Sequence, residues 1–257
     1  MRSVLVTSII LLLFAVFLYA GYQIYVYWKA ENEVTQLNEN LIEQAVTPMT
    51  KDNTADDATK NVPYTPQGET VPIQVDFEAL WQENKDIIAW IYCEGTPIHY
   101  PIVQSADNNY YLRRLLNGSY NVNGSIFLDY RNAADFTDFN SVIYGHNMKN
   151  GEMFACLTKY KEQHYYDEHP TMYLLTPEQN YRIELVAGYV TPSDSEIYTI
   201  PYESQTGTAL LAQAIGQSTF VSSAEAKETD CFITLSTCSY EYDDARYVVI
   251  GKLTAIE

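Results

Sequence analysis

The first stretch of the chain is almost purely apolar. Residues 3–28 contain no charged side chain and consist mainly of Val, Ile, Leu, Phe, Ala and Tyr. A helix of this length exceeds the roughly 20 residues that cross a bilayer. Its C-terminal end is crowded with side chains that suit a membrane–water interface, namely Tyr19, Tyr22, Tyr25, Tyr27 and Trp28. The pattern predicts an N-terminal transmembrane anchor at residues 1–29.

A cleaved signal peptide is the alternative for this stretch. The apolar core of a signal peptide is shorter and ends at a small-x-small cleavage site, which Leu18-Tyr19-Ala20 matches poorly. We therefore favour an uncleaved, single-pass anchor in the cell membrane. The positive charges at the two ends of the stretch, Arg2 and Lys29, nearly balance. The predicted orientation of the anchor in the membrane therefore depends on its position at the N-terminus and on the acidic segment that follows it. Both favour an N-terminus inside the cell and an extracellular domain.

The next segment is polar and acidic. Residues 47–60 contain almost no large apolar side chain, which is typical of a chain that cannot form a core. Before them, Val34, Leu37, Leu41 and Ile42 allow a short helix that continues from the membrane. The composition predicts a flexible acidic linker at residues 30–75 that gives a folded domain reach from the membrane.

Period-two alternation returns in residues 76–257. Helical spacing after Asp76, a plausible N-cap, predicts one helix from Phe77. Alternating and β-rich runs predict strands at 87–92, 99–104, 124–129, 140–144, 172–176, 181–190, 231–237 and 246–253. Short helices are expected at 107–116, 152–160 and 207–217. Many strands joined by short turns, with small helices at the edges, indicate a mainly β fold closed into a barrel.

Charge and cysteine content narrow the possible functions. The net charge of −18 argues against nucleic acid as a partner, because phosphate binding requires basic patches. The sequence contains no P-loop or dinucleotide motif, and we expect no cofactor and no metal. Four cysteines, an even number, leave disulfides open, but a domain of this size does not require them. We favour three buried thiols and one reactive thiol, which a count of free thiols would test against pairing among Cys93, Cys156 and Cys231.

Candidate chemistry begins at Cys238. The alternating run from Cys231 ends at this residue, an acidic connection follows, and Arg246 starts the next β-rich run. If the two runs pair as an antiparallel hairpin, the thiol lies beside the guanidinium. A cysteine held near a fixed cation is activated as a nucleophile. Nothing local supplies a base, so a histidine must come from elsewhere in the chain.

Only four histidines are available as the base. His99 lies within a strand-like run and is expected to be structural. His164 and His169 are five residues apart, which does not match the zinc-protease spacing, and we expect both at the surface. His146 ends an apolar strand just before a Gly-containing loop, a position that suits a barrel mouth. Without a reactive cysteine, His146 would be interpreted as an ordinary turn histidine.

These motifs resemble the sortases. Thr234-Leu-Ser-Thr-Cys238 with Arg246, and Ile143-Tyr-Gly-His146 upstream, carry the resemblance. The surrounding sequence resembles class B in Gly95-Thr-x-Ile-x-Tyr-Pro-Ile-Val103, Asp107-Asn-x-x-Tyr-Leu112, Gly124-x-Ile-Phe-Leu-Asp-x-Arg-Asn132 and Tyr144-Gly-His-x-Met-Lys149. The match runs from about Phe77 to Leu253, so it covers nearly the whole predicted catalytic domain at residues 76–257.

The resemblance implies an eight-stranded sortase-type β-barrel and a cell-surface transpeptidase of a Gram-positive-type bacterium. Cys238 would attack the Thr carbonyl in the C-terminal sorting signal of a secreted protein and form a thioacyl enzyme. His146 would protonate the departing amine and deprotonate the incoming one. Arg246 would stabilise the oxyanion and the bound signal peptide. The acceptor would be an amine of a cell-wall precursor or a pilin lysine.

Four further residues are candidates for substrate binding. The resemblance implies that Asn108 and Leu112 face the peptide, and that Tyr198 lies on the substrate-side loop. Ser236 shares a strand face with Cys238 by period-two alternation. Ordinary packing is the alternative for each of them. Asp129, Arg131 and Asn132 are expected to hold a barrel loop together.

Two other functions remain open from the sequence. One is a secreted cysteine peptidase with water as its normal acceptor. The other is a membrane-tethered binding module without catalysis, in which Cys238 is merely buried.

Overall fold

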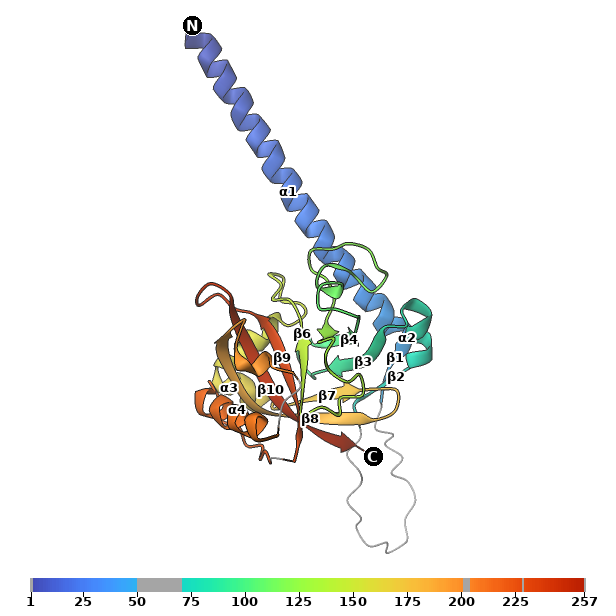
Figure 1. Ribbon diagram of the computed structural model, residues 1–257. Helices are drawn as coiled ribbons and strands as arrows, with labels where there is room; N and C mark the ends of the chain where they lie inside the picture. Colours follow the sequence, from blue (N-terminus) through green and yellow to red (C-terminus); the bar gives the residue numbers. More distant parts are fainter. Residues whose placement is uncertain (1, 50–70, 201–203, 228, 257) are drawn as a thin grey trace, which may run out of the picture.

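Eight strands close into a barrel in the order β10-β8-β7-β3-β4-β5-β6-β9 (Figure 1). The computed structural model describes residues 2–49, 71–200, 204–227 and 229–256. The barrel strands are β3 (Ile87–Tyr92), β4 (His99–Val103), β5 (Phe127–Leu128), β6 (Asn140–Tyr144), β7 (Thr171–Leu175), β8 (Asn180–Pro192), β9 (Cys231–Cys238) and β10 (Ala245–Ile256). The predicted eight-stranded, mainly β fold is confirmed.

Strand β9 is buried on both faces, and the two faces have different neighbours. Ile233 and Leu235 point into the core inside the barrel. Phe232, on the opposite face, packs in a cluster with Leu211 of helix α4 (Ser204–Gln217). Side chains alternate along a strand, so Ser236 and Cys238 share the outer face with Phe232. The end of β9 beyond the α4 cluster therefore presents its polar residues on the outside of the barrel.

Apart from α4 and the long N-terminal helix, the helices are short. They are α2 (Phe77–Glu83), α3 (Gln163–Glu168) and the 3₁₀ helices η1 (Tyr111–Arg113), η2 (Ala155–Lys161) and η3 (Glu196–Tyr198). Asp76 caps α2 as predicted, because its Oδ1 accepts the Ala79 N–H at 3.0 Å. The prediction of a helix at 107–116 is wrong for all of this segment except η1. There the Asp107 carboxylate accepts the N–H groups of Asn109 and Tyr110, which forms a turn in place of a helix.

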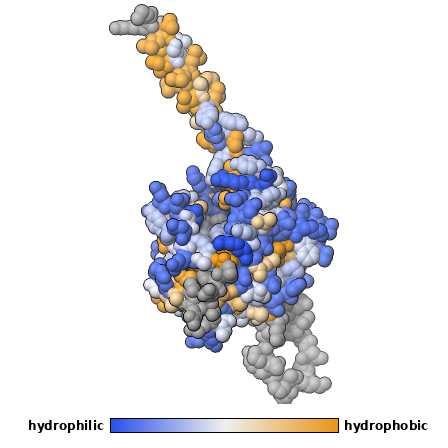
Figure 2. Space-filling model, in the orientation of Figure 1, coloured by the Kyte–Doolittle hydropathy of each residue, from blue (hydrophilic) through white to orange (hydrophobic). Residues whose placement is uncertain are grey.

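Helix α1 (Arg2–Ala45) continues without a break from the apolar stretch to the barrel. Its outer part is exposed and apolar, long enough by length and composition to span a membrane (Figure 2). Its inner part is different, because Val34 and Leu41 are buried against the barrel. These residues lie on one helical stripe, which forms a packing face once a partner is present.

Residues 30–75 were expected to form a flexible linker, but both ends of this range form regular secondary structure. Residues 30–45 belong to α1, and β1 (Val46–Pro48) pairs antiparallel with β2 (Ile73–Val75). The apolar stripe of α1 explains the difference, because burying it against the barrel stabilises the helix far past the predicted end of the anchor. Residues 50–70, which include most of the polar run, lie outside the described residues.

Candidate active site

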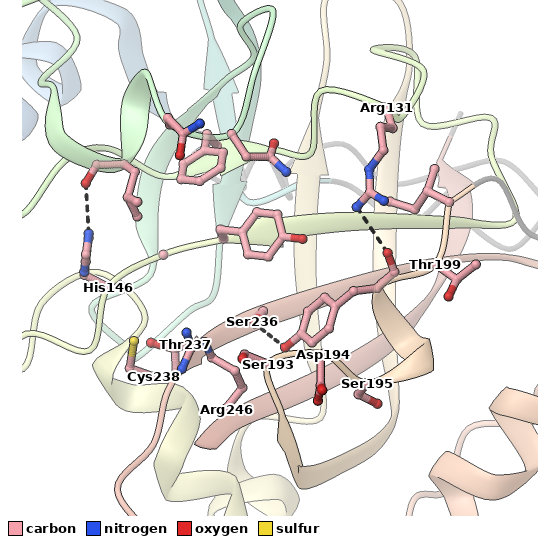
Figure 3. Close-up of a pocket in the computed structure, with 18 residues that line it drawn as sticks. Arg131, His146, Ser193, Asp194, Ser195, Thr199, Ser236, Thr237, Cys238 and Arg246 are labelled. Carbon is pink, nitrogen blue, oxygen red and sulfur yellow. Dashed lines mark hydrogen bonds between the residues drawn. The ribbon is translucent and has the colours of Figure 1, made fainter. Parts of the chain in front are cut away.

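A groove of about 660 Å³ runs across the outer face of the barrel, where β6 and β9 end and β10 begins (Figure 3). Its wall also includes the segment around η1 and the loop after β8. All seven residues singled out from the sequence line it, namely Asn108, Leu112, His146, Tyr198, Ser236, Cys238 and Arg246. Segments that are far apart in the chain thus meet in one place.

Cys238 and Arg246 are direct partners in the β9–β10 hairpin expected from the sequence. The hairpin closes with a hydrogen bond from the Ser239 N–H to the Ala245 carbonyl at 2.9 Å. The Nη1 of Arg246 donates to the carbonyls of Asp244 at 3.2 Å and Ala245 at 3.0 Å, which fixes the guanidinium next to the strand. Within the described part of the chain, no carboxylate forms an ion pair with Arg246. Its charge is therefore available to the groove beside the half-buried thiol.

Parallel pairing of β6 with β9 brings His146 to the same level as Cys238. Tyr144, the last residue of β6, pairs with Ser236, and from this pair each chain segment continues two residues further, to His146 and to Cys238. The side-chain amide of Asn147 donates to the Cys238 carbonyl at 2.8 Å, which ties the two chain segments together. Figure 3 shows His146, Cys238 and Arg246 at one end of the groove.

Gly145 allows the histidine loop to pack closely. A Cβ at this position would lie 2.5 Å from the ring of Phe154, which is fully buried. The Phe154 N–H in turn donates to the His146 carbonyl at 3.0 Å. A larger residue at 145 would displace the Phe154 ring and the segment that carries His146.

A main-chain carbonyl orients the His146 ring. The Nε2 atom lies 3.2 Å from the Leu112 carbonyl oxygen. A carbonyl oxygen can only accept a hydrogen bond, so Nε2 carries the proton and Nδ1 is the basic nitrogen of the neutral ring. This contact was not predicted from the sequence. A backbone group has no side-chain identity, so no sequence signal could have indicated it.

Burial lowers the pKa of His146 below its usual value of 6.5, although the hydrogen bond to the Leu112 carbonyl works in the opposite direction. The positive charges of Arg113 and Arg246 lower it further. A cation next to the ring disfavours the imidazolium form. The resting protein therefore holds a neutral His146 at pH 7.

We expect His146 to titrate below pH 6.5 in an NMR titration of the resting protein, and Arg246→Gln to raise the midpoint by removing one of the two cations. In the unfolded chain, His146 has a higher pKa and binds a proton more readily than in the fold. Its contribution to the free energy of unfolding therefore decreases as the pH falls below about 6.5. A midpoint at or above 6.5 would contradict this environment for the ring.

Ser236 and Tyr198 form the floor of the groove next to the thiol. The Tyr198 hydroxyl and the Ser236 Oγ lie 2.8 Å apart, and the Tyr198 ring stacks on Tyr144 with centroids 6.0 Å apart. Burial raises the pKa of Tyr198 to about 12, partly offset by the Ser236 hydrogen bond and the charge of Arg246. The phenol therefore remains protonated at neutral pH and can donate a hydrogen bond.

Asp129 organises the wall at the other end of the groove. Its buried carboxylate accepts from Arg131 Nε at 2.8 Å, Arg131 Nη2 at 2.7 Å and Asn108 Nδ2 at 2.9 Å. Burial by itself raises the pKa of Asp129, but hydrogen bonds from Arg131, Asn108 and Tyr144 hold it below the usual range. Arg131 also donates to the Tyr198 carbonyl at 3.1 Å, so it lines the groove as well as holding the loop.

Both polar atoms of the Asn108 side-chain amide already form hydrogen bonds. Its amide nitrogen donates to Asp129, and its amide oxygen accepts the Tyr130 N–H at 3.0 Å. Asn108 therefore supports the groove wall. Leu112, by contrast, is exposed on the groove and offers an apolar surface to a peptide.

The other histidines lie outside the groove. His99 is half-buried, and its ring meets the rings of Trp90 and Tyr92 edge-on. His164 is exposed on α3, whereas His169 is half-buried at the end of that helix. The structural role expected for His99 agrees with its packing.

All four cysteines are free thiols, so the disulfide alternative is not formed in the structure. Cys93 and Cys156 are buried, and burial raises the pKa of both thiols, that of Cys156 to about 12. Cys231 is only half-buried, at the end of β9 away from the groove, so the expectation of three buried thiols is wrong for this residue.

Comparisons with known proteins agree with this geometry. A family model described as the sortase domain matches residues 91–254. Sortase B of Listeria monocytogenes is 36% identical over 257 residues, which cover 98% of each chain. The structure of a Staphylococcus aureus sortase B–substrate complex is 29% identical, with a TM-score of 0.67 over 70% of this chain and 85% of that one. A sortase B from B. anthracis is 29% identical, with a TM-score of 0.70 over 90% and 99% of the two chains.

Proposed function

Because this chain belongs to the sortase family, as a cysteine transpeptidase of the sortase B type, we propose that Cys238, His146 and Arg246 are its catalytic residues. In this proposal, it cleaves the C-terminal sorting signal of secreted proteins after a Thr. It then transfers the acyl group to an amine of the cell wall or of a pilin. The observation that carries the proposal is the pairing of Cys238 with Arg246, with His146 at the same level of the groove.

In the first half-reaction, neutral His146 takes the proton of the Cys238 thiol, and the resulting thiolate attacks the Thr carbonyl carbon. The carbonyl oxygen becomes an oxyanion, which the Arg246 guanidinium stabilises from the paired strand. Collapse of the tetrahedral intermediate breaks the peptide bond and leaves a thioester on Cys238. Protonated His146 gives its proton to the amine of the departing C-terminal fragment.

In the second half-reaction, the acceptor amine attacks the thioester. Neutral His146 takes the proton from the incoming amine at Nδ1, the nitrogen left free by the contact of Nε2 with the Leu112 carbonyl. The new amide bond forms as the Cys238 thiolate leaves, and the proton on His146 returns to the thiolate, which restores the resting pair. A thioester suits this role because the thiolate is both a good nucleophile and a fair leaving group.

The groove next to Cys238 suits an extended peptide. Leu112 supplies an apolar contact, whereas Ser236 and Tyr198 supply hydroxyls on the floor. We propose that these three residues bind the sorting signal, and that Asn108 acts through the Asp129 cluster that shapes the wall.

We also propose that α1 anchors the enzyme in the cell membrane as a single-pass helix, with its N-terminus inside and the barrel outside the cell. Support comes from the apolar outer part of α1 and its aromatic end at Trp28. Secreted proteins that arrive at the membrane would then meet the groove directly.

Product analysis of the full chain tests the reaction. The enzyme is incubated with sorting-signal peptides, with and without an amine acceptor such as triglycine. A transpeptidase yields the amide product in preference to the hydrolysed peptide when the amine is present. Hydrolysis that the amine does not affect would identify a peptidase. Failure of a thiol-reactive peptide analogue to label Cys238 would support a non-catalytic binding module.

Arg246→Ala is expected to lower kcat/KM by about 10²- to 10³-fold, because the oxyanion loses its charged donors. Arg246→Lys should recover only part of this loss, since an ammonium keeps the charge but lacks the planar fork. Steady-state kinetics with a cleavable peptide measures both variants. If the loss lies entirely in KM, Arg246 binds the peptide and does not stabilise the transition state.

A further inference from the structure

The end of the apolar stretch lies directly against the barrel. The ring of Tyr27, in the last turn of that stretch, lies 5.7 Å from the Nζ of Lys149 in the loop after β6. Three residues further along α1, the Ala30 carbonyl accepts a hydrogen bond from the Asn121 side chain at 2.9 Å. The Thr35 hydroxyl donates to Glu152 at 2.6 Å. The barrel therefore begins within about one helical turn of the end of the span.

This contact fixes the height of one loop above the membrane. A helix rises 1.5 Å per residue, so Asn121 contacts Ala30 and Glu33 only about 3–8 Å beyond Trp28 along the axis. The headgroup region on each side of a bilayer is about 5–8 Å thick. An ordinary tilt of about 20° brings the contact slightly closer to the lipid. A loop held at Asn121 therefore lies at headgroup level.

The loop at this height has the composition of a membrane-interface segment. Residues 117–124, here called the Tyr120 loop, contain no charged side chain. Tyr120 is 67% exposed and Val122 is 36% exposed. Tyrosine side chains are enriched at membrane–water interfaces, because the ring is apolar and the hydroxyl remains hydrated.

Hydrogen bonds hold the backbone of the Tyr120 loop, which gives its exposed side chains a defined position. Main-chain hydrogen bonds run from the Leu115 N–H to the Ser119 carbonyl and from the Asn121 N–H to the Arg113 carbonyl, both at 3.0 Å. The Asn117 side chain caps the turn by accepting the Ser119 N–H at 3.0 Å. A preformed loop of this kind loses little conformational entropy on contact with lipid.

We propose that the Tyr120 loop places Tyr120 and Val122 in the headgroup layer, so that the barrel has a second membrane contact beside α1. This inference rests on the membrane anchoring proposed above. The loop after β6 and the β9–β10 connection lie at the same end of the barrel as the outer part of α1 (Figure 1). The His146–Cys238 end of the groove therefore faces the bilayer.

The β9–β10 connection is a weaker candidate for lipid contact. It also carries an exposed aromatic residue, Tyr240, but Glu241, Asp243 and Asp244 are exposed next to it. Charged side chains are costly to move out of water toward the apolar layer of a membrane. The uncharged Tyr120 loop has no such obstacle.

Tryptophan quenching by brominated lipid tests the proposal on the full chain in vesicles. The parent carries Trp28→Phe, which removes the tryptophan of the span; Trp81 and Trp90 remain as background. Tyr120→Trp and Val122→Trp place a reporter on the loop. The matched control is Ala255→Trp, an exposed position ten residues along β10 from Ala245 and so about 33 Å from the groove mouth.

We expect the reporter fluorescence of Tyr120→Trp and Val122→Trp to fall at least about twofold in vesicles of lipid brominated near the headgroup. The fluorescence of Ala255→Trp should not change. Resistance to extraction with alkaline carbonate shows that the chain is anchored in the vesicles. If the anchored variants are quenched no more than the control, the proposal is overturned. If carbonate releases the chain, the membrane anchoring itself fails, and this inference fails with it.

Discussion

Cys238→Ala should abolish both transfer and hydrolysis, with a fall in kcat/KM of at least about 10⁴-fold. The proposed mechanism passes through a thioester, and among the described residues Cys238 is the one cysteine that lines the groove. The half-buried thiol lies on the outer face of β9, directly opposite the guanidinium. Peptide cleavage measured by mass spectrometry quantifies the loss. The same measurement should detect the acyl adduct on Cys238 of the unaltered enzyme when the acceptor amine is left out.

Cys231→Ala is the matched control. It removes a half-buried thiol from the same strand, seven residues away at the end opposite the groove. We expect its activity to remain within about twofold of the unaltered enzyme. If Cys238→Ala retained transfer, the mechanism would be excluded, whereas a loss in both variants would point to damage to β9.

His146→Gln is expected to lower kcat/KM by about 10²- to 10⁴-fold. Glutamine keeps a hydrogen-bonding group near the Leu112 carbonyl but cannot exchange a proton with the departing or incoming amine. The pH profile supplies the decisive readout. The unaltered enzyme should show a limb that follows the lowered pKa of His146, and this limb should disappear in the variant. A limb that persists would assign the titration to another group.

The orientation of His146 can be tested separately from its identity. Gly124 has φ +54°, and a Cβ there would lie 2.5 Å from the Leu112 carbonyl oxygen. Gly124→Ala should displace the carbonyl that holds Nε2, lower kcat and change the ¹⁵N shifts that report the ring tautomer. Gly118→Ala is the control, because it has a similar φ of +78° in the same loop but its Cβ would meet nothing closer than 3.8 Å. Equal effects would indicate general strain in the loop.

Features that depend on neighbours in the chain could be predicted from the sequence. The hairpin that pairs Cys238 with Arg246 is one example, because β alternation and a short polar connection specify both strands and the turn. The N-cap at Asp76 is another. The predicted helix at 107–116 failed because the Asp107 carboxylate competes for local N–H groups, which periodicity does not register.

Features that depend on distant segments required the tertiary structure. The apolar stripe of α1 looked like a short extension of the anchor, and only the barrel surface shows why the helix runs to Ala45. Asn108 was identified as a groove residue, but only the position of Asp129 shows that its amide is already occupied.

The sequence by itself determined the three candidates for catalysis, a thiol, a cation and a histidine, because each is a side chain with a chemical identity at the end of a recognisable strand. Tertiary structure alone decided how they meet. Parallel pairing of β6 with β9, about ninety residues apart, brings His146 level with Cys238. The group that orients the ring is the Leu112 carbonyl, which any residue at that position would supply. Every residue carries the same main-chain carbonyl, so the sequence does not indicate which carbonyl contacts the His146 ring. Only the folded backbone shows it.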